Sequence, residues 1–312
     1  MPRVIATETE DRIELGDLIE TLQTGGFDPR DEDNFAAFGP ALKKLGNNRA
    51  FLSDIIIQEL KDRCANQLET NFYTPQVIML HRKGGNFLIR ANIWPAESDS
   101  IVRHSGTDPF FYGKAHDHNF SFLTVGYLGP GYWSEYYEYD YEQVAGYPGE
   151  PVDLRYVEKS RLDQGKVMLY RIHKDVHLQL PADEMSISLN ILETGDQHPF
   201  LDQYEFDVDK GEVRAPITRT SIEPLLSLSA HFGGEEGMDL IESFAAGHPN
   251  DRIRFHALKA RAAAGDLDAR IAVYEKAANS ANRYVSAMAK AEAGKLEKGR
   301  AWLGGSALQS AA

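Results

Sequence analysis

Residues 110–141 read FFYGKAHDHNFSFLTVGYLGPGYWSEYYEYDY, and the rest of the fold can be inferred outward from this stretch. His116 and His118 are two residues apart, so in an extended segment both imidazoles lie on one face while Asp117 points the other way. Residues 119–128 form a β-branched and aromatic run, which a Gly-Pro-Gly sequence separates from a second run that ends the stretch. This order predicts a strand, a turn and a strand, with two histidines at the mouth of the first strand.

A region further along the chain has a matching layout. Gly165 opens a strand-like run that reaches residue 172, and His173 and His177 follow it. The segment PADEMSISL then begins another strand-like run, over 185–192. Residues four apart share a side of an extended chain, so both downstream histidines are candidates to face the upstream pair.

Together the two regions resemble the paired motifs of the cupin superfamily, in which a His-x-His pair is followed later by a glycine turn, a strand and one more histidine. About a dozen residues separate that glycine from the histidine in the family, as they separate Gly165 from His177 here. The PADEMSISL segment is similar to the one that follows the ligand in cysteine-dioxygenase-like cupins. The resemblance implies that His116, His118 and His177 hold a metal, with His173 as the reserve third ligand.

The resemblance to cysteine dioxygenases covers about residues 73–208 and includes the glycine turn before the metal motif. Ser188 matches the serine of the family, but no cysteine follows the His-x-His pair. Pro75 stands where the family has its carboxylate-binding arginine, and Leu192 stands where it has the crosslinked tyrosine. Asn190 replaces the histidine before that tyrosine, and Phe122 replaces the cupin glutamate. What the resemblance implies is therefore a three-histidine metal site, and not thiol oxidation.

Three neutral imidazoles leave a divalent ion its full charge and open positions for substrate and dioxygen. Iron(II) is the expected metal, and zinc, nickel and manganese also suit such a site. A different metal set remains open, because His173 and Asp175 form a His-x-Asp that resembles the facial triad of 2-oxoglutarate-dependent oxygenases, with His198 or His231 as the distal ligand. A further alternative is a cupin scaffold whose histidines are structural, without metal.

A hairpin is predicted where runs at 76–81 and 86–94 flank the turn Arg82-Lys83-Gly84-Gly85. Alternate residues of the second run are apolar, so we expect that face to pack on helices. Arg90 and Asn92 then point into the interior and bind substrate, and Arg90 or Arg82 takes the place of the missing carboxylate clamp. If the faces are reversed, Arg90 is a solvated sheet residue.

The aromatic run over 132–141 contributes rings to one or both faces of its sheet. Most of these rings are expected to pack in the core. Tyr137 lies mid-strand and is the residue that we assign to the site, where it would position substrate or donate a hydrogen bond to bound oxygen.

The composition limits the class of protein. The chain has 312 residues and a formal charge of −14, which argues against nucleic acid as a partner because phosphate binding needs clustered Lys and Arg. Its single cysteine, Cys64, excludes an intramolecular disulfide and suggests a reducing compartment. No signal sequence or membrane-length apolar run is present, so we expect a cytoplasmic protein with no membrane partner.

Helices are predicted on both sides of the β region. Apolar stripes predict three before residue 70, over 15–22, 35–45 and 51–60, with Cys64 in the third. After a linker at 213–220, five helical segments follow, and the tail from 304 to 312 is expected to be disordered. The segments RFHALKARAAAGD and YVSAMAKAEAGK echo one another and resemble paired-helix repeats of the HEAT type.

The predicted fold is mainly β: a cupin-type barrel over 71–212, with packed helices over 1–70 and an α-helical domain over 221–303. The predicted function is a mononuclear non-haem iron oxygenase or dioxygenase that acts on a small molecule, which would be amino-acid-like or a thiol. The alternative is a non-catalytic cupin that binds a ligand or scaffolds other proteins. In either case the C-terminal helices are candidates to bind a protein partner or form a homo-oligomer.

Overall fold

The strands form two six-stranded antiparallel sheets in the computed structural model, which describes residues 1–74, 76–82 and 84–309. The first sheet has the order β1-β8-β5-β10-β3-β2, and the second has the order β12-β11-β4-β9-β6-β7. The strands are β1 (Arg3–Ile5), β2 (Val77–His81), β3 (Phe87–Trp94), β4 (Ala115–His116), β5 (Phe122–Leu128), β6 (Trp133–Glu138), β7 (Arg155–Arg161), β8 (Val167–Tyr170), β9 (Asp175–Gln179), β10 (Ser186–Glu193), β11 (Tyr204–Asp207) and β12 (Glu212–Pro216).

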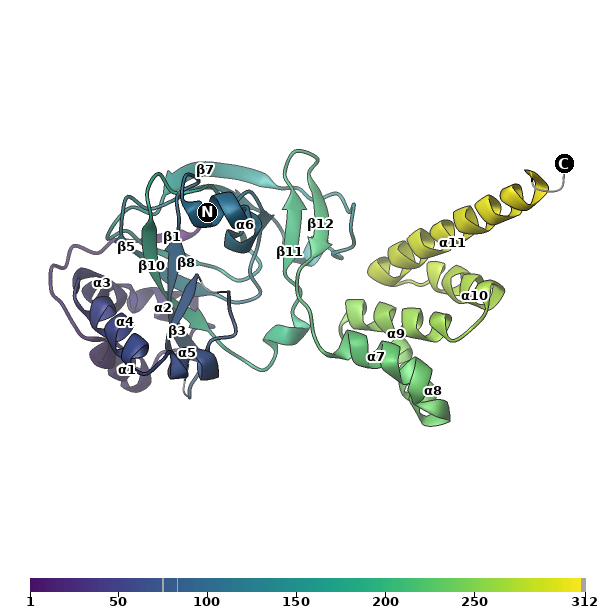
Figure 1. Cartoon of the computed structure of the whole chain (residues 1–312), viewed down its shortest axis with the longest axis horizontal. Helices are drawn as coiled ribbons and strands as arrows, with labels where there is room; N and C mark the ends of the chain where they lie inside the picture. The colour runs from purple at the N-terminus through teal and green to yellow at the C-terminus, as the bar shows by residue number, and fades with distance from the viewer. Residues whose placement is uncertain (75, 83, 310–312) are drawn as a thin grey trace. The chain divides into compact units, whose positions relative to one another are not determined.

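Helices precede and follow the strands (Figure 1). The α-helices are α1 (Leu15–Thr24), α2 (Glu32–Ala37), α3 (Gly39–Asn47), α4 (Phe51–Lys61), α5 (Ala65–Thr70), α6 (Ser100–Ser105), α7 (Ile222–Phe232), α8 (Gly234–Gly247), α9 (Asp251–Ala263), α10 (Leu267–Ala278) and α11 (Arg283–Gln309). Short 3-10 turns cover η1 (Asp108–Phe110), η2 (Tyr141–Gln143) and η3 (His198–Phe200). No described helix is both long enough and apolar enough to cross a bilayer.

The two sheets do not close into the predicted barrel. Over the described residues each sheet ends in its own edge strands, β1 and β2 in one and β12 and β7 in the other. The sheets meet through side chains instead: Leu88 and Trp94 of the first pack in one buried cluster with Tyr136 of the second. The space between the two sheets is therefore an interior that side chains from both can line.

The N-terminal helices cover the outer face of the first sheet (Figure 1). Leu18, Leu42 and Phe51 pack in one buried cluster with Ile89 of β3 and Val125 of β5. The predicted alternation in β3 is correct, because Phe87, Ile89 and Ala91 belong to this cluster while Leu88 and Trp94 belong to the cluster between the sheets. Arg90 and Asn92 share the parity of the second set, so they too point between the sheets.

Two details of the predicted N-terminal helices are wrong. The stripe over 35–45 belongs to two helices, because α2 ends before Phe38 and α3 starts at Gly39 with a proline in its first turn, where a missing N–H is tolerated. Cys64 is not part of the third helix. That helix, α4, ends at Lys61, and Cys64 has a left-handed backbone with φ 57° just before α5.

The chain divides into two compact units. The first consists of residues 1–141, 151–198 and 203–212, and the second of 142–150, 199–202 and 213–312. Within the second unit Arg252 is 1% exposed, and its guanidinium forms ion pairs with Asp202 at 2.8 Å and with Glu223. Such a buried arrangement holds its elements together, because removing one member leaves an uncompensated charge.

The structure corrects the predicted linker and tail. Part of the linker is β12, since Asp209-Lys210-Gly211 is a turn that lets the chain return as a strand. The tail is helical as far as Gln309 because no proline interrupts α11. Pro75, Lys83 and residues 310–312 lie outside the described residues, and so do the predictions that concern them.

Candidate metal centre

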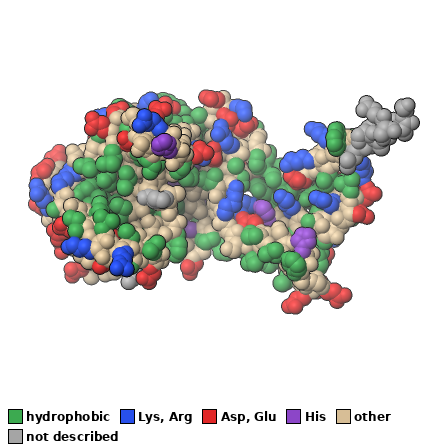
Figure 2. All heavy atoms as spheres, viewed as in Figure 1, with side chains coloured by type: hydrophobic (Ala, Val, Ile, Leu, Met, Phe, Trp, Pro, Cys, Tyr) green, Lys and Arg blue, Asp and Glu red, His purple; other side chains and the backbone are tan. Residues whose placement is uncertain are grey.

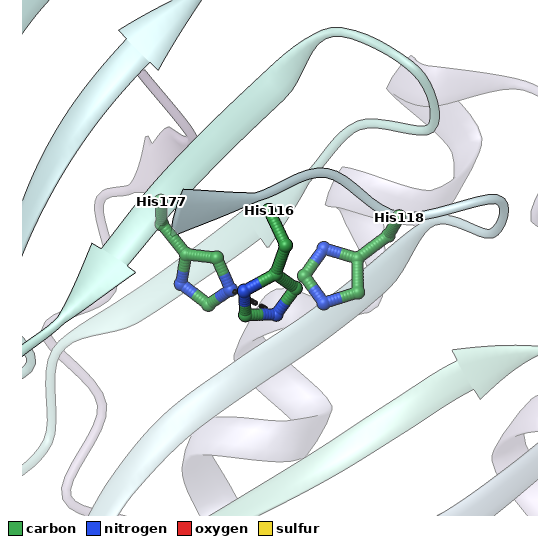
Figure 3. A group of neighbouring side chains, drawn as sticks. All are labelled: His116, His118 and His177. Carbon is green, nitrogen blue, oxygen red and sulfur yellow. Dashed lines mark hydrogen bonds between the residues drawn. The ribbon is translucent and has the colours of Figure 1, made fainter. Parts of the chain in front are cut away.

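Three histidines from two strands and a loop converge in the first unit (Figure 3). Strand β4 pairs antiparallel with β9 in a register that puts His116 opposite His177. His118 follows β4 by two residues and faces the same side, as the His-x-His spacing predicts. One candidate ligand nitrogen from each ring lies within 4.8 Å of the other two. This is the one such group of histidine, cysteine or acidic side chains among the residues described.

The separation of the imidazoles fits a shared metal ion. The Nε2 atoms of His116 and His177 are 3.2 Å apart. Two imidazole nitrogens that bind one metal at about 2.1 Å each lie about 3.0 to 3.4 Å from one another. The Nδ1 atoms of His118 and His177 are buried and lack a hydrogen-bond partner in the described chain, so no hydrogen bond from the protein fixes the tautomer of either ring. The donor set therefore fits a divalent transition metal.

A backbone carbonyl sets the orientation of His116. Its Nδ1 lies 2.9 Å from the carbonyl oxygen of Lys114, to which it can donate its proton. That tautomer directs the Nε2 lone pair toward the cluster. A carbonyl or carboxylate that accepts from the outer nitrogen of a histidine is the usual support of a metal-binding imidazole.

Burial keeps the three imidazoles neutral. It lowers the pKa of His116 to about 4, and the positive charge of nearby Lys114 adds to this effect. Burial also holds the pKa of His118 and of His177 well below the usual value for histidine, and the neighbouring imidazoles lower both further. Neutral imidazoles present lone pairs at pH 7, which is the form that binds a metal.

Asp117 supports the cluster from the opposite face of the chain. Its carboxylate is fully buried and accepts hydrogen bonds from the Tyr139 hydroxyl and the Tyr204 backbone N–H, each at 2.6 Å. Tyr204 begins β11, which pairs with β4, and Tyr139 directly follows β6. Asp117, the residue between the two histidines, thus links the end of β4 to β11 and to the segment that follows β6.

The cluster lies at one side of a pocket of about 350 Å³. Its wall is built from β3, β4, β5, β9 and β10 together with loops of the same unit. No acidic residue is present among its described lining residues, and Arg90 is the one Lys or Arg among them. They are Phe72, Tyr73, Thr74, Gln76, Val77, Arg90, Asn92, Trp94, Pro109, Phe110, Phe111, His116, His118, Phe120, Phe122, Tyr132, His177, Gln179, Asn190 and Gln203.

Arg90 and Asn92 both line this pocket, on the face of β3 that the sequence assigned to the interior. Arg90 is half-buried, and its guanidinium carbon lies 4.5 Å from the ring centroid of Tyr73. Burial lowers the pKa of Arg90, and the arginine charge in turn lowers the pKa of His118. In the described chain no carboxylate pairs with this guanidinium, and its Nε is buried without a hydrogen-bond partner. The pocket therefore carries an uncompensated positive charge.

Tyr137 does not line the pocket. Its hydroxyl donates to Glu135 at 3.3 Å, and its ring packs edge-on against Tyr156 of β7, on the other face of the sheet. The ring of this aromatic run that lines the pocket is that of Tyr132. The expectation that Tyr137 faces the interior is therefore wrong, and Tyr132 is the tyrosine of this run at the pocket wall.

The structure separates the two downstream histidines. His177 lies in β9 within the cluster, whereas His173 lies in the preceding turn with φ 55° and stacks on Tyr141 at 3.6 Å between ring centroids. Asp175 is buried in ion pairs with Arg171 and the N-terminus. His198 and His231 are not in the cluster either. The alternative His-x-Asp metal set is therefore not assembled.

Several pocket residues are ones that sequence reasoning missed. Gln179 follows His177 by two residues, and Asn190 is paired across strands with Arg90, so strand parity could have indicated both. Phe111 had no such signal: it has a left-handed backbone with φ 58°, and its ring centroid lies 5.2 Å from that of His116.

No protein-family model matches this chain, and no curated protein matches it. Solved structures that are similar in part include the DMSP lyase DddQ from Ruegeria pomeroyi DSS-3, with 14% identity over 38% of this chain and 46% of that chain and a TM-score of 0.23. A salicylate 1,2-dioxygenase from Pseudaminobacter salicylatoxidans has 10% identity over 45% and 33%, with a TM-score of 0.25. A cupin-like protein from Thermotoga maritima has 13% identity over 42% and 74%, with a TM-score of 0.22. The chain thus spans about half or less of the length of the first two.

Proposed function

We propose that this chain is a mononuclear, metal-dependent oxidoreductase of the cupin type, a dioxygenase whose ion is held by His116, His118 and His177. The observation that carries the proposal is the cluster itself: three buried, neutral imidazoles whose candidate ligand nitrogens all lie within 4.8 Å. Iron(II) is the proposed metal, and zinc, nickel or manganese are the alternatives that the same donors accept. When bound, an iron(II) ion supplies the redox chemistry and Lewis acidity that dioxygen chemistry needs.

The chain's own residues would bind and orient an anionic substrate. Arg90 lines the pocket without a carboxylate partner, and a half-buried guanidinium in this position is stabilised by a ligand that brings one. Asn92, Gln179 and Asn190 are at least nine-tenths buried and also line the pocket, so their amides can fix the orientation of polar groups on the substrate. A small carboxylate, including an amino-acid-like one, suits these groups.

Aromatic walls would keep water away from the reacting groups. Trp94, Phe122 and Tyr132 are nearly fully buried and line the pocket beside the histidines. Burial raises the pKa of Tyr132, so its hydroxyl stays protonated at neutral pH and can donate a hydrogen bond. Because low-dielectric surroundings strengthen electrostatic interactions, the same walls increase the effect of Arg90 on a bound anion.

The test begins with metal analysis of protein purified without chelators. We expect one divalent ion per chain, and oxygen uptake when the iron-loaded protein receives a member of a panel of carboxylates, amino acids and thiols. Protein with less than a tenth of an equivalent of metal after incubation with each candidate ion would contradict the metal site. Full metal without oxygen uptake on any compound would contradict the oxygenase.

A second candidate function is a non-catalytic ligand-binding protein. The observation in its favour is that the described wall of the pocket has no carboxylate to act as a general base. In this alternative the C-terminal helices would bind a protein partner or a second copy of the chain, for which α7 offers the exposed side chains of Leu225, Leu228 and Phe232. Anion binding that is independent of metal, without oxygen uptake, is the result that distinguishes it.

A further inference from the structure

The pocket has an apolar opening. Lining residues that are also exposed mark where a pocket meets solvent, and here these are Phe72, Tyr73, Thr74, Pro109 and Phe111. Three of the five are aromatic: Phe72 is 75% exposed, Tyr73 41% and Phe111 40%. Large apolar groups that are left in water are informative when they gather at one place, since such patches mark binding sites. On the face shown in Figure 2, green apolar side chains reach the surface of this unit among charged ones.

Each ring at the opening has a cation on it. The guanidinium carbon of Arg82 lies 4.4 Å from the ring centroid of Phe72, and Lys114 Nζ lies 5.6 Å from that of Phe111. Arg90 makes the corresponding contact with Tyr73. Contacts of this kind are attractive, because the face of an aromatic ring carries partial negative charge. The cations therefore help to hold the rings at the opening in place, above all that of Phe72, which is the most exposed of the three.

Phe111 is held in an unusual backbone conformation. Its φ of 58° is disfavoured for a residue with a bulky side chain, and it occurs where η1 ends. The backbone N–H of Phe111 donates to the Asp108 carbonyl, which maintains this turn. The turn directs the ring toward His116, at 5.2 Å between centroids, while 40% of the residue stays exposed. Phe111 thus extends from the histidine cluster to the opening.

Arg90 lies between the opening and the cluster. Its guanidinium contacts the ring of Tyr73 at the opening, and its charge acts on His118 in the cluster. When the anionic group of a ligand is bound to Arg90, the rest of the ligand can therefore extend in two directions, toward the histidines or outward between the aromatic rings. A pocket of about 350 Å³ falls in the range that holds ligands of drug-like size, about 300–1,000 Å³, and has room for both.

Building on the proposed function, we infer that the substrate is an amphiphilic carboxylate: a carboxylate for Arg90 joined to an aryl or alkyl group that packs between Phe72 and Phe111. Phe72 and Phe111 are then specificity-determining residues, which favour such a compound over a free, small amino acid. Burying these exposed rings against an apolar ligand group provides the binding energy that Arg90 alone does not.

Isothermal titration of the full chain with three probes tests this assignment: 3-phenylpropionate, propionate, which lacks the aryl group, and 3-phenylpropionamide, which lacks the charge. We expect 3-phenylpropionate to bind at least about tenfold more tightly than either of the others, since each of them lacks one of the two interactions. Equal affinity for propionate would overturn the apolar part, and equal affinity for the amide would overturn the carboxylate part.

Variants locate the contact. Phe111→Ala and Phe72→Ala are each expected to weaken 3-phenylpropionate binding about five- to tenfold and to leave propionate binding unchanged. Leu68→Ala is the control, because Leu68 is 81% exposed in the same unit and does not line the pocket. Little of the Phe72 side chain is buried, so Phe72→Ala should fold normally. This variant therefore still tests the inference if Phe111→Ala is unstable. Unchanged binding in both variants, or an equal loss in the control, would contradict the inference.

Metal content of the same samples separates this inference from the proposed function. Protein that holds metal but shows no preference for 3-phenylpropionate would overturn the substrate class alone. Protein that prefers 3-phenylpropionate through Phe72 and Phe111 but holds no metal would overturn the metal centre alone.

Discussion

The carboxylate of Asp117 accepts a hydrogen bond of 2.6 Å from the hydroxyl of Tyr139, and so the residue between the two upstream histidines is anchored to the chain that follows β6. Both residues are buried, Asp117 fully and Tyr139 to within 3%. Burial raises the pKa of Tyr139, and the nearby carboxylate of Asp117 raises it further, so the hydroxyl remains a donor at any physiological pH. Neither residue lines the pocket, so an effect of this contact on His116 and His118 would pass through the backbone that Asp117 shares with them.

Tyr139→Phe should therefore weaken metal binding as well as stability. The variant leaves a buried carboxylate with one donor fewer, for which we expect a loss of about 1–3 kcal/mol in the free energy of unfolding. Supporting contacts of metal ligands typically change affinity by about 10- to 100-fold, and a decrease in that range is expected in a chelator competition titration. Tyr137→Phe is the matched control, since Tyr137 lies two residues earlier, in β6, and its hydroxyl donates to Glu135 instead of Asp117. Equal effects in both variants would contradict an orienting role for Tyr139.

Replacing either upstream histidine should remove the metal without unfolding the sheets. His116→Ala and His118→Ala each delete one of three donors, so we expect bound metal to fall to background in elemental analysis. Circular dichroism should show that the metal-free proteins remain folded, because the pairing of β4 with β9 and β11 is made by the backbone, although each variant loses ring contacts such as that of His116 with Phe111. His104→Ala, at an exposed position on α6, is the control. Metal that is retained in full by either cluster variant would rule out the site.

The two downstream histidines give a second discrimination. His177→Ala is expected to lose the metal, since His177 stands opposite His116 in the β4–β9 pairing. His173→Ala should keep most of it, because that ring stacks on Tyr141 in the turn. Metal retention is measured after passage over a desalting column, with circular dichroism as the check on folding. The reverse pattern would move the third ligand to His173.

Arg90→Lys keeps the positive charge but removes the planar fork that grips a carboxylate at two points. We expect 3-phenylpropionate to bind about tenfold more weakly to this variant, while metal content stays at the wild-type value. The neutral amide probe should bind both proteins equally, because it does not depend on the fork. An unchanged affinity for the carboxylate would remove Arg90 from the substrate site.

The helical unit should lose stability in mild acid through His256. Burial, together with the positive charges of Lys259, Arg252 and Arg219, lowers the pKa of this half-buried imidazole to about 4, against about 6.5 in an unfolded chain. As the pH falls, the unfolded state therefore takes up a proton on His256 before the folded state does. The contribution of the neutral imidazole to the stability of the folded state is complete above pH 6.5 and decreases between pH 6.5 and pH 4. Urea unfolding at several pH values should show this decrease in the wild type and a shallower one in His256→Gln. Parallel curves would exclude His256 as the cause.

Local patterns in the sequence determined much of the secondary structure and half of the site. Apolar stripes located α1 and α4, and the alternation over 87–94 showed which face of β3 packs on helices, because both periodicities arise from the geometry of one segment. The two-residue spacing placed His116 and His118 on one side for the same reason. These inferences concern residues that are close in sequence, and the local backbone conformation sets the relative positions of such residues.

Only the tertiary structure decided which distant residues meet. The aromatic run has rings on both faces of β6, and only the packing of the two sheets decides that Tyr132 lines the pocket and Tyr137 does not. The choice of His177 over His173 likewise depends on the pairing of β4 with β9, across about 60 residues of sequence. Strand registers, bulges and the spacing of two sheets are set by long-range packing, and it is this packing that brings Arg90, the aromatic opening and the three histidines to one pocket.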